Sequence, residues 1–546
     1  MTGHRGDAPG VVRNPILPGF HPDPSVCRLG DDFFLVTSTF EYFPGLALFH
    51  SRDLVHWRQL GHVLDRPEQL PLDGVRPSGG LYAPTIRHHA GVFYVTCTLV
   101  DGTSRSGNFV VTASAPAGPW SQPVWLDDAP GIDPSLFFDD DGTAWFVGQR
   151  QVDPGEYEGH CEIWARRFDP VGLRLFGPDH VLWHGAVAGA IWAEGPRLYR
   201  IDGRYYLLIA EGGTGHDHAV TVARADVVTG PYVGNPANPV LTHRHLRRDH
   251  PIVGPGHADL VRAPDGSWWM ALLAMRPYGG YFYNLGRETF LVPVSWSDGW
   301  PLVSPDTGRV ELEYPAPGLP AVRWPAEAAC DNFAGAVLGP QWMMLRTPRE
   351  RFWSLTERPG HLRLRLRPQT LTEPVNPSFV GRRQQHRDFA AHTALDFAPR
   401  TDRECAGLVL LQNTDFQLRL EVAGGPTPAA PDRAGPVAPA GPDRAGRLIR
   451  LVRRTHGRDE VLAEEPVAAG GPLYLGVQAH GQEYTLRYAT EADRWVVLGP
   501  PVDGRFLSTP VAGGFVGTVL GMYASSQGGP GGNVADFDWF EYRALG

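Results

Sequence analysis

The stretch DPSLFFDDDGTAWFVG, residues 133–148, decides the fold because four other stretches of the chain repeat its pattern. It opens on a proline-containing start and continues as a short apolar run. It then turns at Asp and Gly and ends in an aromatic-rich run, which predicts a β-hairpin. The matching stretches are DPSVCRLGDDFFLV (23–36), APTIRHHAGVFYVT (83–96), GPRLYRIDGRYYLLI (195–209) and HADLVRAPDGSWWMAL (257–272).

The spacing of these hairpins leaves room for two more strands in each repeat. The steps between successive starts are 60, 50, 62 and 62 residues. Segments such as GNFVVTASAPAGPW (107–120) and HAVTVARADVVTGPY (218–232) supply the later strands. Five four-stranded units at this period predict a five-bladed β-propeller over residues 1–314. An ordinary β-sandwich would require the five matches to be accidental.

The repeat starts carry acidic and histidine side chains. The first strand of each blade lines the central channel of a propeller. Asp23, Asp133 and His257 stand at repeat starts, and Glu194 stands one residue before the fourth. We therefore expect these four side chains to converge on one funnel, although they are far apart in the chain.

The second half of the chain has a different pattern. Residues 315–330 are rich in Pro and Ala and are interpreted as a linker. From residue 331 to 546, runs such as HLRLRLRP (361–368) and LYLGVQAH (473–480) alternate polar and apolar residues, which predicts a second, all-β sandwich. Within it, the Pro-, Ala- and Gly-rich residues 424–446 are interpreted as a surface insertion between two strands, and their role is left open.

Composition excludes several classes of function. The 546 residues carry a net charge of −10 and no basic block, which argues against nucleic acid as a partner. The sequence contains no Lys, so P-loop, kinase-type and Schiff-base chemistries are excluded. The five Cys are scattered without a CxxC pair, which predicts free thiols rather than a zinc site or a disulfide framework.

Targeting signals are not evident. The first fifteen residues, MTGHRGDAPGVVRNP, lack the apolar core of a secretory signal, and no run of about 18 apolar residues predicts a membrane span. We therefore expect a cytoplasmic protein that acts on a small polar substrate.

Three converging acids suit glycoside hydrolysis. One carboxyl group must protonate the leaving oxygen, and in inverting enzymes a second activates water on the opposite face of the sugar. A third acid nearby raises the pKa of the proton donor by charge repulsion. Asp23, Asp133 and Glu194 form such a set, although any one Asp-Pro alone is more often a turn device. His257 is equally compatible with a buried structural histidine and with a metal ligand.

Aromatic and planar side chains near the repeat starts suit sugar binding. Phe40 lies in STFEYFPG, and Tyr82 precedes the second repeat start. The guanidinium group of Arg287, in GRETFL, could donate two hydrogen bonds to sugar hydroxyl groups. Core packing explains most aromatic residues equally well.

Several motifs together resemble glycoside hydrolase family 43, in its two-domain β-xylosidase and α-L-arabinofuranosidase branch. The similarity spans nearly the whole chain, including a concanavalin-like C-terminal sandwich. The motifs are NPILPGFHPDPSVCR, STFEYFPG, SRDLVHW, GIDPSLFFDDDG, WAEGPRLY, IAEGGTGHDHAVTVAR, GHADLV, RPYGGYFYNLGRETFLVPVSW and GRRQQHRDF.

The resemblance implies roles that the residues alone do not give. It implies an inverting exo-glycosidase in which Asp23 is the general base, Asp133 modulates the pKa of the acid and Glu194 is the general acid. It implies that Arg287 contacts substrate. It further implies that His257 lies on the propeller axis, where some members hold Ca²⁺, although no cofactor is required. The C-terminal domain would lend a loop aromatic, here Phe515, to the pocket mouth.

Two departures from the family pattern bear on sugar preference. Tyr42 and Tyr82 stand where the family usually has Trp, and Ala193 precedes the acid where Pro or Thr is commoner. The three acids and the resemblance together predict release of xylose from the non-reducing end of β-1,4-xylo-oligosaccharides, and the resemblance implies a homo-oligomer of two or four copies. An α-L-arabinofuranosidase or dual enzyme is the nearest alternative, and a non-catalytic carbohydrate-binding protein is a more remote one.

Overall fold

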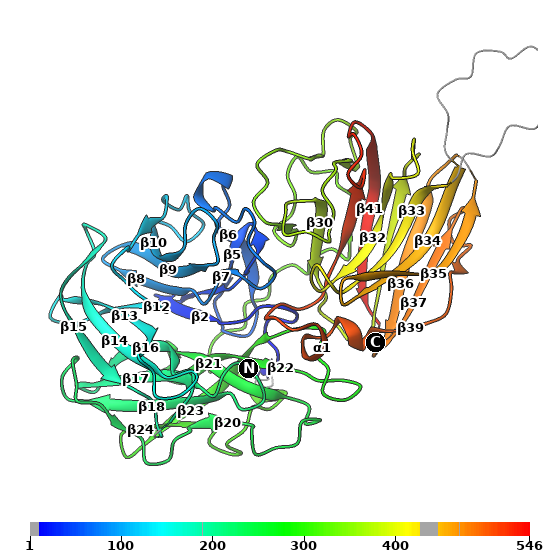
Figure 1. Cartoon of the computed structure of the whole chain (residues 1–546). Coiled ribbons are helices and arrows are strands. Elements are labelled where there is room, and N and C mark those ends of the chain that lie inside the picture. The colour runs from blue at the N-terminus through cyan, green and yellow to red at the C-terminus, as the bar shows by residue number, and fades with distance from the viewer. Residues whose placement is uncertain (1–9, 188, 426–445, 469, 546) are drawn as a thin grey trace, which may run out of the picture. The chain divides into compact units, whose positions relative to one another are not determined.

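The structure, a computed structural model, describes residues 10–187, 189–425, 446–468 and 470–545 (Figure 1). The chain divides into two compact units. The first comprises residues 1–72, 78–281 and 286–325, and the second comprises residues 73–77, 282–285 and 326–546. The predicted linker is divided between them at residue 325. Val322 N–H donates to Asp53 and the Trp324 indole donates to the His56 carbonyl, which holds its first part on the first unit.

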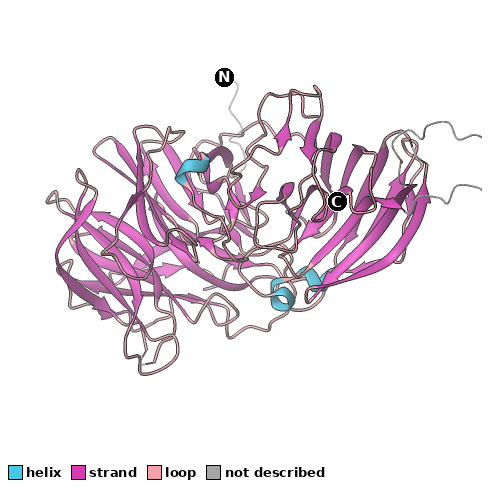
Figure 2. Cartoon of the chain, turned by 45° about the horizontal axis from the view of Figure 1, so that its top comes forward, coloured by secondary structure: helices cyan, strands magenta, loops and turns pink. Residues whose placement is uncertain are grey.

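The described residues are almost entirely strands and loops (Figure 2). Helix in them is confined to three short turns: η1 (Pro67–Gln69), η2 (Gly504–Leu507) and α1 (Thr509–Ala512). None of the helices in the described part of the chain is long and apolar enough to cross a membrane. The predicted all-β class is confirmed.

The first unit is the predicted five-bladed propeller, in which each blade is a sheet of four or five strands. Blade 1 contains β2 (Ser25–Leu29), β3 (Asp32–Thr37), β5 (Gly45–Ser51) and β6 (Arg58–Leu64). Blade 2 contains β7 (Gly80–Leu81), β8 (Thr85–His89), β9 (Val92–Val100), β10 (Gly107–Ala113) and β11 (Val124–Trp125). Blade 3 contains β12 (Ile132–Phe138), β13 (Ala144–Gln151), β14 (Cys161–Asp169) and β15 (Arg174–Trp183).

Blades 4 and 5 follow the same order of antiparallel strands. Blade 4 contains β16 (Glu194–Ile201), β17 (Arg204–Glu211), β18 (Ala219–Ala225), β19 (Val233–Gly234) and β20 (Leu241–Thr242). Blade 5 contains β21 (Val253–Arg262), β22 (Trp268–Met275), β23 (Glu288–Ser297) and β24 (Trp300–Val303). The first strands β2, β8, β12, β16 and β21 contact one another in sequence, and β21 returns to β2. The repeat starts therefore surround one axis.

The N-terminal segment closes the ring of blades. Strand β1 (Val11–Arg13) pairs with β25 (Glu313–Pro315). Beyond it the chain runs along β23, where the Asn14 side chain bonds Leu291 and the backbones of Leu17 and Thr289 exchange hydrogen bonds. His21 N–H then donates to the Arg287 carbonyl at 3.0 Å. The two ends of the propeller thus meet two residues before Asp23.

The second unit is a β-sandwich of two sheets. One sheet contains β30 (Ser378–Arg383), β40 (Val519–Ser525), β32 (Cys405–Leu411), β33 (Gln417–Gly425), β34 (Gly446–Thr455) and β35 (Arg458–Val467). The other follows the path β28 (Trp353–Ser354), β29 (Leu362–Arg365), β41 (Val534–Ala544), β31 (Phe389–Asp396), β36 (Leu473–His480), β37 (Glu483–Ala489) and β38 (Val496–Val497). Strands β26 (Cys330–Asp331) and β39 (Val502–Asp503) join this sheet at β41 and β37. Two further short strands are β4 (Tyr42–Phe43) of the first unit and β27 (Met344–Leu345) of the second.

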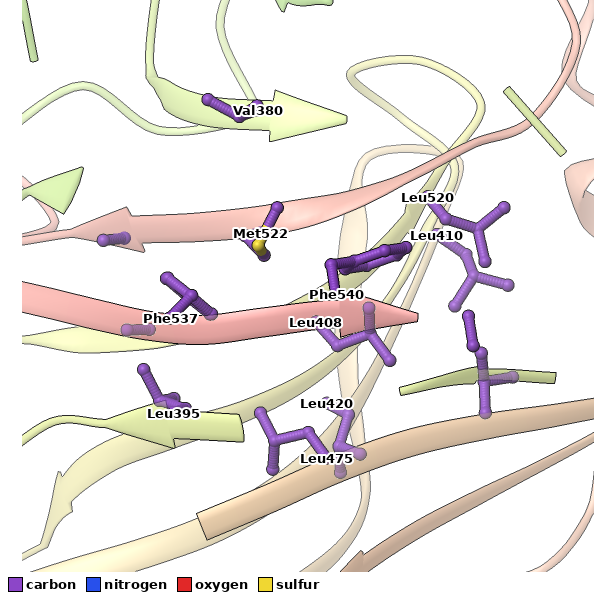
Figure 3. Packing of buried hydrophobic residues seen from close by; sticks show 14 of the residues in the cluster. Val380, Leu395, Leu408, Leu410, Leu420, Leu475, Leu520, Met522, Phe537 and Phe540 are labelled. Carbon is purple, nitrogen blue, oxygen red and sulfur yellow. The ribbon is translucent and has the colours of Figure 1, made fainter. Parts of the chain in front are cut away.

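The sandwich core follows from the alternating pattern of its strands. Leu408, Leu420 and Met522 from the first sheet meet Leu475 and Phe537 from the second (Figure 3). Strands β33 and β34 pair as far as Gly425 and Gly446. Most of the predicted 424–446 insertion lies outside the described residues.

Two short segments that interrupt the propeller sequence also pack in the second unit. Arg346, which is 1% exposed, donates from Nε to the Val75 carbonyl at 2.7 Å. Asn284 donates to the Gly504 carbonyl at 2.8 Å and to the Tyr484 hydroxyl at 3.2 Å. The sandwich therefore incorporates residues 73–77 and 282–285.

Candidate active site

The residues that start the repeats share an unusual backbone conformation. Asp23, Asp133 and His257 have φ of 54°, 56° and 46°, and Gly195 has φ of 60°. A non-glycine residue in this left-handed region costs on the order of 1–3 kcal/mol, and such residues cluster at functional sites. The common conformation shows that the four residues occupy one equivalent position in blades 1, 3, 4 and 5.

A β-bulge accompanies that position in three blades. The pairing register shifts between Ile132 and Ser135, between Glu194 and Arg197, and between Gly256 and Asp259. A bulge bends a strand and redirects its side chains, and bulges are frequent beside active sites. The inner strands therefore pair with their blades over most of their length and depart from regular pairing at the candidate residues.

Asp23 is buried and held by two donors. The Ser38 hydroxyl donates to its Oδ2 at 2.6 Å, and Arg287 donates to its Oδ1 at 3.0 Å. Burial alone would raise the pKa of Asp23, but the Arg287 cation, with the Ser38 hydroxyl, outweighs it and lowers the pKa below its ordinary value. Asp23 is therefore an anion at neutral pH.

Asp133 has the opposite electrostatic environment. It is 3% exposed and accepts the Gly195 N–H at 3.1 Å. Burial and the Asp23 charge raise the pKa of Asp133 to about 7, against the opposing effect of Arg197. The Gly195 bond also ties Asp133 to the strand that carries Glu194.

Glu194 is the most strongly perturbed acid of the three. Its side chain is partly exposed at the start of β16. Burial, followed by the Asp133 and Asp23 charges, raises the pKa of Glu194 well above its usual range. Asp133 and Glu194 are coupled, and we assign their shared proton to Glu194, which has more neighbours of like charge and fewer donors. At neutral pH the site therefore contains Asp23 as an ionised carboxylate and Glu194 as a proton donor.

His257 packs directly over the backbone beside Glu194. A Cβ atom on Gly195 would lie 2.8–3.1 Å from the His257 ring, so only glycine fits there. Burial lowers the pKa of His257 to about 3 and that of its neighbour His218 to about 4. Both rings are neutral, and the Nε2 atom of each is buried with no hydrogen-bond partner among the described residues.

These two rings do not by themselves form a calcium site. Ca²⁺ takes six to eight oxygen ligands, whereas the axis offers imidazole nitrogens. No group of three or more His, Cys, Asp or Glu side chains in the described residues is arranged to hold a metal ion. Axial Ca²⁺ bound at His257 stays a prediction.

Models of two domain families match the chain in the same order as its two units. Residues 12–301 match glycosyl hydrolases family 43, and residues 330–543 match the β-xylosidase C-terminal concanavalin A-like domain. The chain belongs to glycoside hydrolase family 43. The propeller with three differently tuned carboxyl groups is thus the catalytic domain of a glycoside hydrolase.

Similar family 43 proteins cover almost the whole chain. A xylosidase/arabinosidase of Butyrivibrio fibrisolvens is 43% identical over 97% of this chain and 99% of its own. A non-reducing end α-L-arabinofuranosidase of Bacteroides ovatus is 41% identical over 98% of this chain and 95% of its own. The solved structure of xylan β-1,4-xylosidase from Bacillus halodurans has a TM-score of 0.89 at 35% identity, covering 97% of this chain and all of that one.

The aromatic residues expected to bind sugar in this family 43 chain form one cluster. Phe40 stacks on Phe20 with ring centroids 6.0 Å apart and packs against Tyr82 at 5.4 Å. The Arg287 guanidinium lies 5.4 Å from the centre of the Phe40 ring. Phe40 is only 2% exposed, whereas Tyr82 is partly exposed. Tyr82 therefore presents the more accessible ring, with Phe40 as its support.

Phe515 is partly buried in the second unit, between α1 and β40. Its predicted place at the mouth of the pocket stays a prediction.

Sequence reasoning missed several residues of the site. Ser38, which holds Asp23, gives no signal in the sequence. The Thr214 hydroxyl accepts a hydrogen bond from the Arg287 nitrogen that also donates to Asp23. Asp259 and Arg197 lie inside the repeats, two residues after His257 and three after Glu194. Their place in the pattern could have identified these two as axial residues.

Proposed function

We propose that this protein is an inverting exo-glycosidase that releases xylose from the non-reducing end of β-1,4-xylo-oligosaccharides. The observation that carries the proposal is the contrast between Asp23, whose pKa is lowered, and Glu194, whose pKa is raised. An inverting hydrolase needs a base that is already ionised and an acid that still holds its proton. Asp23, with its lowered pKa, supplies the ionised base, and Glu194, with its raised pKa, supplies the protonated acid.

In the proposed reaction Asp23 accepts a proton from a water molecule as the water oxygen bonds to the anomeric carbon. The bond from that carbon to the leaving oxygen breaks, and Glu194 donates its proton to that oxygen. Asp133 raises the proton affinity of Glu194 and, through the Gly195 N–H, fixes the strand that carries it. The sugar is released with inverted configuration.

Arg287 is proposed to act in two ways. Its bond to Asp23 keeps the base ionised, and its position over Phe40 places donors beside the aromatic cluster. Tyr82 is proposed to stack on the sugar ring that occupies the pocket.

An α-L-arabinofuranosidase, or an enzyme with both activities, is the second candidate. Two of the most similar proteins are described as a xylosidase/arabinosidase and as an α-L-arabinofuranosidase. Tyr82, which stands where the family usually has Trp, is proposed to form the wall where the two pentoses would be distinguished, whereas Tyr42 is fully buried and cannot touch the sugar.

The decisive experiment compares initial rates on an aryl β-xyloside and an aryl α-L-arabinofuranoside and follows the configuration of the released sugar by NMR. We expect faster release from the xyloside and inversion at the anomeric carbon. Faster arabinose release would favour the second candidate. Tight binding of xylobiose without product at any pH would favour the non-catalytic alternative.

Two variants test the assigned residues. Asp23→Ala and Glu194→Ala should each lose most activity on xylobiose while remaining folded. Near-normal turnover by either variant would refute the assignment. Assembly into two or four copies and a cytoplasmic location stay predictions, which sedimentation and cell fractionation would test.

A further inference from the structure

A second buried charged cluster lies on the axis beside the catalytic carboxyl groups. It consists of Arg87 from β8, Arg197 from β16 and Asp259 from β21, and we call it the Arg87–Arg197–Asp259 cluster. Asp259 is fully buried and accepts two hydrogen bonds from Arg87, at 2.9 and 3.2 Å.

Other blades also bond Asp259. It accepts from the Ser25 hydroxyl at 2.7 Å, from the Val26 N–H at 3.1 Å and from the Tyr199 hydroxyl at 2.5 Å. Together with Arg87, these donors come from blades 1, 2 and 4. Burial opposes ionisation of Asp259, but Arg87 and Arg197 outweigh it and lower the pKa of its carboxyl group. Asp259 is therefore an anion.

Arg197 links this cluster to the catalytic strand. It is fully buried three residues after Glu194 and donates to the carbonyls of Pro196 at 3.0 Å and Pro84 at 3.3 Å. Its Nε lies 3.8 Å from Asp259 and has no hydrogen-bond partner among the described residues. Burial lowers the pKa of Arg197, but an arginine stays protonated at neutral pH. One carboxylate thus faces two guanidinium groups, which leaves the cluster with one surplus positive charge.

The charges of the axis balance when one proton is counted. Three guanidinium groups and four carboxyl groups lie there: Arg87, Arg197, Arg287, Asp23, Asp133, Glu194 and Asp259. Charge left uncompensated in a buried site is costly. The set is neutral when one carboxyl group is protonated, and two protons or none would leave a net charge in the interior.

We propose that the Arg87–Arg197–Asp259 cluster sets the number of protons on the catalytic carboxyl groups at one, so that Glu194 stays protonated while Asp133 and Asp23 stay ionised. The proposal rests on the catalytic roles proposed above for these three residues. Arg197 acts in it as a positioning residue, because it affects the reaction through Asp133 and Glu194 and has no contact with substrate assigned to it.

The other titratable groups that face these carboxyl groups do not change the count. His257 on β21 and His218 at the foot of β18 are neutral. Burial raises the pKa of the Cys97 and Cys161 thiols, so both are neutral as well. Burial also raises the pKa of Tyr199 well above its usual range.

Two further buried acids, Glu288 and Glu211, do not belong to the axial set whose charges are counted above. The Glu288 carboxylate on β23 is matched by the two hydrogen bonds it accepts from Arg276. Glu211, at the far end of β17, accepts from Thr221 and from the Ala186 N–H, and neither bond is to a residue of the axial set.

The test removes one positive charge and follows the pH dependence of kcat/KM. Xylobiose and an arabinofuranosyl-substituted xylo-oligosaccharide are the substrates, because an aryl leaving group departs without needing a proton. Arg197→Met should move the alkaline limb of the profile to higher pH by at least about half a unit, since every nearby carboxyl group then holds its proton more tightly. Arg197→Lys keeps the charge and should leave the limb near the wild-type position.

Arg200→Met is the matched control. Arg200 lies three residues farther along β16, where it is partly exposed and pairs with Asp139 and Asp140. Its removal should leave the limb unchanged. Asp259→Asn adds one net positive charge to the cluster and should move the limb to lower pH, the direction opposite to Arg197→Met.

Several outcomes would overturn the proposal. An alkaline limb that coincides in Arg197→Met and Arg200→Met, or that shifts the same way in Arg197→Met and Asp259→Asn, contradicts a charge count. If Arg197→Met does not fold, Arg87→Met at its partly exposed position must show the upward shift. Failure of both to fold would mean that the cluster acts only as a cross-link.

A readout without substrate separates this inference from the proposed function. The melting temperature of Arg197→Met, relative to Arg200→Met, should fall progressively from pH 5 to pH 9 as uncompensated carboxylates form. Lack of turnover by the wild-type enzyme on both oligosaccharides would refute the proposed function alone. A pH-independent difference in melting temperature would refute the charge count alone.

Discussion

Arg287 and Asp23 are joined by a hydrogen bond of 3.0 Å although 264 residues separate them in the chain. The bond forms where the N-terminal segment runs along β23, so the contact that closes the propeller and the contact that holds the proposed base lie between the same two stretches of chain. The blades between these residues bring the other two acids to the same axis.

Removal of the Arg287 cation should move the whole pH profile. Arg287 lowers the pKa of Asp23 and of Glu194, so Arg287→Met should raise both. We expect both limbs of kcat/KM on xylobiose to shift to higher pH, the acidic limb by about one unit or more. Arg309→Met, at an exposed position, is the control and should show no shift. An unchanged acidic limb would contradict the role assigned to the Arg287–Asp23 bond.

Asp133→Asn should alter both catalysis and stability. Loss of the Asp133 charge lowers the pKa of Glu194, so the alkaline limb should move to lower pH. Asp133 and Glu194 share one proton that the folded state holds above the ordinary pKa of either group, so the folded state loses stability as pH rises from 4 to 7 and the carboxyl groups of the unfolded chain release theirs. The melting temperature of the variant relative to wild type should therefore increase across that window. A constant difference from pH 4 to pH 8 would count against the raised pKa.

Gly195→Ala tests the packing of His257 beside the acid. The added Cβ would meet the His257 ring at 2.8 Å and would also suffer the strain of φ at 60°. Gly203→Ala, in the same blade at φ of 81° with nothing within 4 Å, carries the strain alone. We expect both variants to lose about 1 kcal/mol or more of unfolding free energy, and only Gly195→Ala to lose kcat as well. Equal kcat in the two variants would mean that His257 does not position Glu194.

Tyr82→Ala should weaken substrate binding more than the chemical step. Its ring is proposed to stack on the sugar both before and during the reaction, so its loss should raise KM several-fold with a smaller change in kcat. Tyr82→Phe keeps the ring and should remain close to wild type. Values of kcat and KM both unchanged in Tyr82→Ala would place Tyr82 outside the sugar pocket.

The propeller could be predicted because its pattern is local. Each hairpin has its own turn residues and aromatic strand, and the period of about 60 residues shows that the units are equivalent. Asp23, Asp133 and His257 were predicted to converge because they occupy one position in that repeat. The equivalence extends to the backbone, since Gly195 takes the left-handed conformation that Asp23 and Asp133 take.

Contacts across the axis could not be predicted in the same way. The period places Arg87 and Asp259 in their blades, but it does not say which buried charges meet, and these two are 172 residues apart. Ser38 reaches Asp23 from the strand connection of blade 1, where no repeat marks it. Residues 73–77 and 282–285 lie within propeller sequence and pack in the sandwich, because their contacts are with Arg346 and Tyr484 rather than with neighbouring blades.

Closure by the segment from Asn14 to His21 has a consequence for synthesis on the ribosome. A nascent chain that has extruded four blades already contains Asp23, Asp133 and Glu194. The backbone that fixes the position of Asp23, and the cation that keeps it ionised, lie in β23 and the residue before it. Hydrolytic activity should therefore appear only after about residue 291 has left the exit tunnel, and not in proportion to the number of blades completed.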